Sequence, residues 1–140
     1  MFTEFEITHD CIDTEKYKHR FEQDSCGASV SFLGQVRNTN DGQEVSALEY
    51  EIFEELAVKE GLQIMMETRE KFPILQAYAV HRHGLLQIQD CAVFIRVSSQ
   101  HREDAFAACR YIIDQIKKRL PIWKKEYYTN LSAQWVFCQH

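Results

Sequence analysis

The sequence predicts an α+β domain with a largely antiparallel sheet. The expected elements follow the order strand, helix, strand, strand, helix, strand, strand, helix, strand, so neighbouring strands are often joined directly, as in hairpins. Such an order favours antiparallel pairing over a doubly wound parallel sheet, in which helices separate the strands. At 140 residues the chain is most simply one domain spanning 1–140, long enough to bury roughly two thirds of its unfolded surface.

The N-terminal part predicts a short strand followed by a helix. Phe5 and Ile7 alternate with polar residues, as in a strand with one buried face. Asp13 or Thr14 can cap the helix, because the side-chain oxygen accepts a hydrogen bond from a free N–H group of the first turn. The apolar residues expected on one face of this helix are Tyr17 and Phe21.

Two strands are expected next, joined as a hairpin. Residues 27–37 form a half-buried strand in which apolar residues alternate with serines. Residues 38–42 are polar and predict a turn or flexible loop, and a second strand at 45–52 follows directly. The apolar residues of the first strand are Ala28, Val30 and Phe32.

The second half of the chain predicts two long helices and three strands. Residues 54–71 are strong helix formers, and Pro73 ends that helix. Apolar runs at 77–80 and 91–97 predict strands, and residues 81–84 begin their connection. A helix at 102–120 ends at Pro121, and a last strand contains Ala133, Trp135 and Phe137. The expected buried residues are Leu56, Ala57, Ile64 and Met65 in the first helix and Phe106, Cys109, Ile112, Ile113, Ile116 and Leu120 in the second.

Cations gather at both ends of the 102–120 helix, although the formal net charge of the protein is -5. Grouped cations on an acidic protein indicate an anionic ligand or the acidic surface of a partner. At the first end, His101 and Arg102 stand beside the free N–H groups of the first helical turn, with Ser99 as a plausible cap. Because cations there oppose the helix dipole, a functional reason for them is favoured.

At the other end, Lys117 lies about 40° from Ile113 around the helix, whereas Lys118 points away from the apolar stripe. A lysine at the edge of an apolar face can act as a general acid or base near neutral pH. Lys124 follows on the other side of Pro121. The alternative interpretation is that these cations only complement the helix dipole and remain solvated.

Arg37 is a further candidate, because it ends a strand beside a polar loop. Its planar guanidinium could hold a phosphate or a carboxylate with two parallel hydrogen bonds. A solvated charge at a strand end is the alternative.

Several other sites and classes are not indicated. The five cysteines are widely spread without a Cys-x-x-Cys pair, which argues against disulfides and structural zinc. His81-x-His83 is a weak metal pair, so no metal site is expected. The acidic balance argues against nucleic-acid binding, and no apolar run approaches the length of a membrane span. The acidic N-terminus lacks signal-peptide features, so a cytoplasmic location is expected.

A set of short sequences stands in order over residues 27–136. They are Phe32-Leu-Gly-Gln-Val-Arg37-Asn38, Leu48-Glu-Tyr-Glu51, Val80-His-Arg-His-Gly84, Ser99-Gln-His101-Arg102, Ala105-Phe106 and Lys117 through Pro121-Ile-Trp123-Lys124-Lys125-Glu126. Each is weak alone, but the ordered set is specific, above all the Pro-x-Trp-Lys-Lys-Glu segment after His-Arg. Together they resemble the catalytic (large) subunit of molybdopterin synthase, the MoaE family.

The resemblance implies the α/β-hammerhead fold and a sulfurtransferase. The reaction of the family converts cyclic pyranopterin monophosphate into molybdopterin by installing a dithiolene, with no cofactor. The sulfur donor is a thiocarboxylated C-terminus of a small ubiquitin-like subunit, and the large subunit is a homodimer within a heterotetramer. By position, the resemblance makes Lys117 and Lys124 catalytic. The substrate-binding residues that it implies are Gln35, Val36, Arg37, His101, Arg102, Lys125 and Glu126.

The chemistry of these residues agrees with the reaction, because the substrate phosphate, the sulfur donor and the released carboxylate are all anions. Sulfur transfer also needs proton movements, a role for Lys117 if burial lowers its pKa. The alternative from a different class is a non-catalytic binding module whose cationic groove receives the acidic C-terminal tail of a partner protein.

Overall fold

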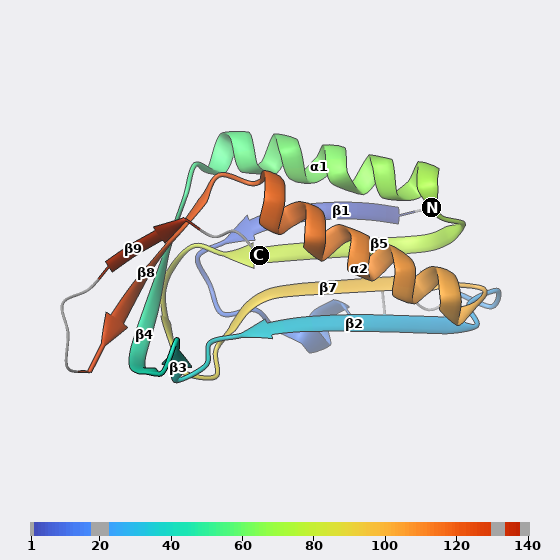
Figure 1. Ribbon diagram of the computed structural model, residues 1–140. Helices are drawn as coiled ribbons and strands as arrows, with labels where there is room; N and C mark the ends of the chain where they lie inside the picture. The colour runs from blue at the N-terminus through green and yellow to red at the C-terminus, as the bar shows by residue number, and fades with distance from the viewer. Residues whose placement is uncertain (1, 18–22, 130–133, 138–140) are drawn as a thin grey trace.

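Two sheets and two α-helices make up the part of the chain that the structure describes (Figure 1). The computed structural model describes residues 2–17, 23–129 and 134–137. The first sheet has the strand order β1-β5-β7-β2, in which the β1–β5 pair is parallel and the other pairs are antiparallel. The predicted α+β class is confirmed. The strands of this sheet are β1 (Phe2–Thr8), β5 (Ile74–Arg82), β7 (Cys91–Ser99) and β2 (Ala28–Gln35).

The second sheet is shorter and stands at one end of the first (Figure 1). It has the order β3-β4-β8-β9. The short strand β6 pairs with the edge of β4 that faces away from β8. All of its pairs are antiparallel. Its strands are β3 (Thr39–Asn40), β4 (Gln43–Ile52), β6 (Gly84–Gln87), β8 (Ile122–Tyr128) and β9 (Gln134–Phe137).

Both helices cover one face of the first sheet (Figure 1). Helix α1 (Glu54–Lys71) packs on β1, and α2 (Arg102–Arg119) packs on β7 and β2 as well as on α1. Their inward residues share one apolar core with the sheet, which rigidly fixes both ends of α2. The buried helix residues include Ala57, Ile64 and Met65 of α1 and Cys109, Ile112 and Ile116 of α2.

The bounds of both long helices match the prediction closely, because proline and helix propensity act locally. Two expected core residues, Leu56 and Phe106, are exposed instead. Ser99 does not cap α2: the N-cap residue is His101, and the Ser99 hydroxyl donates to the carbonyl oxygen of His101.

The helix predicted after Asp13 or Thr14 is only a 3-10 turn in the described residues, η1 (Thr14–Tyr17). Asp13 accepts a hydrogen bond from the backbone N–H of Glu15, as expected of a capping residue. Phe21 lies outside the described residues.

The predicted hairpin between residues 27–37 and 45–52 is wrong, because β2 and β4 belong to different sheets. The chain leaves the first sheet after a register shift between Gly34 and Gln35, and Val36 is buried. The hairpin partner of β4 is instead the two-residue β3. Asp41 and Gly42 form the turn between them with φ values of 50° and 78°, as hairpin turns of two residues require.

Three strands were not predicted: β3, β6 and β8. All three pair with β4, with β6 and β8 on opposite sides of it, and β8 carries the segment that follows Pro121. The backbone N–H of Phe53 donates to the carbonyl oxygen of Pro121 over 3.2 Å, which joins the start of α1 to the turn after α2. This contact helps to position the cations on either side of Pro121.

Candidate active site

A buried carboxylate holds Lys124 in place. The Nζ atom of Lys124 lies 3.2 Å from Oε1 of Glu126, and the side chain of Glu126 is 1% exposed. Glu126 also accepts hydrogen bonds of 2.8 and 2.9 Å from the side-chain amide of Asn40, and one from the Tyr128 hydroxyl. Burial acts to raise the pKa of Glu126, but these donors and the Lys124 ammonium outweigh it, so the pKa lies below its usual value.

The strand pairing directs Lys124 toward the interior. Lys124 is opposite Tyr50 in the antiparallel β4–β8 pair, and Glu126 is opposite Leu48. Residues directly opposite in such a pair share a face of the sheet, and both Tyr50 and Leu48 are buried. The side chain of Lys124 is accordingly only 12% exposed.

His81 connects this face with Lys117. The ring of Tyr50 stands edge-on to the imidazole of His81, with 5.0 Å between centroids. Complete burial, together with the charges of Lys117 and His83, lowers the pKa of His81 to about 4 although the hydrogen bond to the Arg82 carbonyl oxygen acts to raise it, so the ring is neutral at pH 7. Its Nδ1 donates to the Arg82 carbonyl oxygen over 2.8 Å, while Nε2 has no hydrogen-bond partner among the described residues.

Lys117 occupies the place on α2 that the helical pattern predicts. It is half-buried, whereas Lys118 is exposed. It lines an open groove between α2 and β2, whose other lining residues are Val30, Ser31, Phe32, Phe106, Cys109, Arg110, Ile113 and Asp114. The groove is partly apolar, and Phe32 lies in it rather than in the core.

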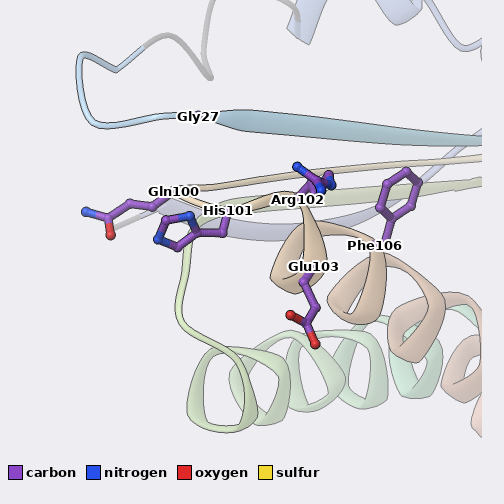
Figure 2. A pocket seen from close by; sticks show the side chains of 6 residues that line it. All are labelled: Gly27, Gln100, His101, Arg102, Glu103 and Phe106. Carbon is purple, nitrogen blue, oxygen red and sulfur yellow. The ribbon is translucent and has the colours of Figure 1, made fainter.

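A second cavity lies at the opposite end of α2 (Figure 2). Arg102 and Phe106 extend in the direction of β2, whereas Glu103 extends the other way. His101 and Arg102 are exposed, and their helix leaves its first N–H groups available to an anion. The cavity is lined by Gly27, Gln100, His101, Arg102, Glu103 and Phe106.

The two ends of α2 do not meet within one chain. Arg102 and Lys117 belong to the same uninterrupted helix, so their Cα atoms are about 22 Å apart along its axis. The structure therefore brings Lys124 and Glu126 to the face of the sheet that holds Tyr50 and, beside it, His81, with Lys117 near enough to lower the pKa of His81. His101 and Arg102 lie at the other end of α2.

The remaining predicted residues occupy three different environments. Arg37 is exposed and donates to Oδ1 of Asn40 over 3.4 Å, which connects it with Glu126 through the Asn40 side chain. Gln35 is exposed and donates to the Gln89 carbonyl oxygen, whereas Val36 is buried in the core. Lys125 lies on the other face of β8, opposite Glu49 and 5.3 Å from the centre of the Tyr127 ring.

Comparisons with known proteins agree with this architecture. The family model described as "MoaE protein" matches residues 7–119. The molybdopterin synthase catalytic subunit of Thermoplasma volcanium is 43% identical over 133 residues, which are 95% of this chain and 97% of that protein. This chain belongs to the MoaE family. Within this family, a solved structure of molybdopterin synthase from Staphylococcus aureus superposes with a TM-score of 0.88 at 43% identity, covering 94% of this chain and 96% of that one.

A more distant structure shows the same fold. It is a complex of subunits 1 and 2 of molybdopterin-converting factor from Helicobacter pylori, with a TM-score of 0.76 at 19% identity, covering 97% of this chain and 90% of that one. No helix in the described part of the MoaE-family chain is long and apolar enough to cross a membrane.

Two residues of the site, Asn40 and Tyr50, were not singled out by the sequence, and His81 was considered only as half of a weak metal pair. Asn40 reaches Glu126 across 86 positions of sequence, and no local pattern indicates that contact. The only signal was the Asp41-Gly42 pair, a turn that returns the chain toward β4.

Proposed function

We propose that this chain converts cyclic pyranopterin monophosphate into molybdopterin, using two sulfurs from the thiocarboxylated C-terminus of a small ubiquitin-like subunit. The observation that carries the proposal is the pair of lysines on two elements, with Lys124 buried against Glu126 and Lys117 close enough to His81 to affect its pKa. Such a cationic site in a protein of net charge -5 suits a reaction whose participants are anions.

In this proposal Lys117 and Lys124 are the catalytic residues. Lys117 moves protons during attack and departure of the thiocarboxylate, while Lys124 stabilises the negative charge that develops on the acyl group. Glu126 fixes the direction of the Lys124 side chain through their 3.2 Å contact. The neutral ring of His81 adds no positive charge beside Lys117, and its pKa of about 4 supports this.

Substrate binding is assigned to the surrounding polar groups. Arg37, on the exposed side of Asn40, is placed to hold the phosphate with its guanidinium. Gln35 presents an exposed amide, and Val36 fixes the backbone between them. The outward direction of Lys125 supports a contact with the partner subunit rather than with the pterin.

We further propose that the chain acts in the cytoplasm as a homodimer within a heterotetramer, with each active site shared between two copies. His101 and Arg102 of one copy then complete the site that contains Lys117 and Lys124 of the other. The rigid separation of about 22 Å within one helix supports this arrangement. A two-fold axis can place the start of one α2 beside the end of the other.

The deciding experiment incubates the protein with cyclic pyranopterin monophosphate and the thiocarboxylated small subunit, and measures molybdopterin. A small subunit that ends in an ordinary carboxylate is the matched control. Formation of molybdopterin only with the thiocarboxylate supports the proposal. Tight binding of the small subunit with no product would instead show a binding module for an acidic tail.

A further inference from the structure

Three side chains that play no part in the proposed reaction converge at the start of α1. The Nε2 atom of His9 and the Nδ1 atom of His83 each lie 2.9 Å from the same oxygen, Oε2 of Glu54. The two imidazole rings are stacked, with 4.5 Å between centroids and an interplanar angle of 26°. All three ligand atoms lie within 4.8 Å of one another.

The fold holds the two histidines side by side. Strands β1 and β5 are parallel, with Thr8 opposite Arg82, so His9 and His83 are the next residues of the two strand ends. The backbone N–H of His83 donates to the Thr8 carbonyl oxygen over 2.8 Å, which continues the pairing to this point. Glu54, the first residue of α1, then supplies a carboxylate to both rings.

The Nδ1 atom of His83 is available to a ligand. It is buried, and although it lies 2.9 Å from Oε2 of Glu54, it makes no hydrogen bond to a described residue. The other ring nitrogen, Nε2, lies 4.0 Å from Oε2 of Glu51. A carboxylate behind the second nitrogen is the usual support of a metal-bound histidine, since it orients the ring and raises its basicity.

We propose that His9, Glu54 and His83 bind a divalent transition-metal ion, with Zn²⁺ the best match. Two imidazole nitrogens and one carboxylate oxygen suit zinc, nickel or copper better than magnesium or calcium, which prefer oxygen ligands. The ion replaces the proton that His9 now shares with Glu54, and a water fills the fourth position.

The site has a structural consequence, because its three ligands come from the ends of β1 and β5 and the start of α1. A bound metal ion would hold these three segments together. Because the backbone N–H of Phe53 donates to the Pro121 carbonyl oxygen, the ion would also restrict the motion of the turn between Lys117 and Lys124. An ion that binds only the folded state stabilises it by RT ln(1 + c/Kd), where c is the concentration of the free ion, so the melting temperature rises with the logarithm of the ion concentration over its Kd.

From the sequence no metal site was expected, and only His81-x-His83 resembled a metal pair. His81 is fully buried and does not belong to the group that brings three possible ligand atoms together among the described residues, which is His9, Glu54 and His83. The partner of His83 is His9, and nothing local in the sequence relates these two residues.

The test uses the purified full-length protein after treatment with a chelator. Calorimetric titration with Zn²⁺ should give one saturable site, and Co²⁺ should give the visible absorption bands of a tetrahedral ion. Glu54→Gln and His9→Ala should each weaken Zn²⁺ binding by more than about tenfold, and Glu51→Gln should weaken it by about tenfold. Zn²⁺ should raise the melting temperature of the parent but not of Glu54→Gln.

Two controls keep the result specific. Glu55→Gln removes an exposed carboxylate one position away and should leave the Zn²⁺ affinity within about twofold of the parent. Cys11→Ser removes an exposed thiol near His9, and a persistent Co²⁺ spectrum without a thiolate band would confirm that the thiol is not needed. Absence of saturable binding by the parent, or equal affinity in the parent, His9→Ala and Glu54→Gln, would overturn the proposal.

Discussion

The ammonium nitrogen of Lys124 lies 3.2 Å from a carboxylate oxygen of Glu126, two positions along the same strand and on the same face. The carboxylate is buried and remains ionised because Asn40, Tyr128 and Lys124 all donate to it. The Lys124 ammonium is therefore held by a carboxylate whose side chain is 1% exposed.

Glu126→Gln should lower the turnover number roughly tenfold to a hundredfold, because it removes a charge-assisted contact of about 1.5–3 kcal/mol. The new amide group would also face the donor of Asn40. The measurement is the rate of molybdopterin formation. Glu49→Gln is the matched control, since Glu49 accepts from Tyr127 on the outer face of the same sheet. An equal fall of the turnover number in the two variants would show that Glu126 has no specific role in the site.

Lys117→Ala should nearly abolish sulfur transfer, whereas Lys118→Ala should have little effect. Lys117 is half-buried beside the groove, and Lys118 is exposed on another side of α2. Lys117→Arg should also fail, because a guanidinium does not give up its proton near neutral pH. Single-turnover assays with the thiocarboxylated subunit measure all three variants, and thermal melts check that each is folded. An active Lys117→Arg variant would argue against proton transfer.

Arg37→Ala should mainly weaken substrate binding, by roughly 1.5–3 kcal/mol or about tenfold to a hundredfold in Kd. The side chain is exposed, and its hydrogen bond to Asn40 is long, at 3.4 Å, so stability should change little. Titration of the substrate into the variant measures the effect. Arg69→Ala, an exposed arginine on α1, serves as control. Unchanged affinity in Arg37→Ala would identify Arg37 as a solvated charge.

The buried His81 should make the protein less stable in mild acid. Its pKa is about 4 in the folded state and about 6.5 when unfolded, so the unfolded state binds a proton first. The contribution of His81 to the free energy of unfolding is fully present above pH 6.5. It is lost as the pH falls toward 4, and the loss reaches about 3 kcal/mol. Urea unfolding across this range measures it.

His81→Asn should flatten that pH dependence, because the amide can still donate to the Arg82 carbonyl oxygen but does not titrate. His101→Asn, at an exposed position, should leave it unchanged. A His81→Asn protein with the same acid sensitivity as the parent would assign the effect to other groups.

Two inactive variants should restore activity when they are mixed. In a dimer of one Lys117→Ala chain and one Arg102→Ala chain, one shared site carries both changes and the other carries neither. About a quarter of the parent activity is expected after random exchange, since half of the dimers are mixed and each has one intact site. Exchange is verified by mass spectrometry of the intact dimers. Confirmed exchange without recovery would show that each site lies within one chain.

Local features of the fold were predictable from the sequence, and long-range pairings were not. Both long helices end where Pro73 and Pro121 forbid their continuation, and Lys117 and Lys118 differ in burial as the helical period requires. The strand at 27–37 was recognised, but its partner was not. Alternating burial says which face of a strand is inward and nothing about which strand lies beside it.

The same limit applies to the site. The cations were visible as a group because they stand at the ends of one helix, and the family resemblance supplied their roles. The contact of Asn40 with Glu126 and the burial of His81 depend on how the two sheets meet. The convergence of His9 and His83 depends on a parallel register that no hairpin-like order would suggest.

The length of helix α2 fixes the distance between its two cationic ends. Its 18 residues rise about 27 Å in one uninterrupted rod, and each residue added to it would shift one end by about 1.5 Å and turn it by about 100°. A single insertion between Arg102 and Lys117 would therefore aim one of the two ends away from its ligand. An insertion in a loop would not turn one cationic end relative to the other. The length of α2, more than that of any connection, therefore sets the distance and relative direction of the two cationic ends that face a large substrate.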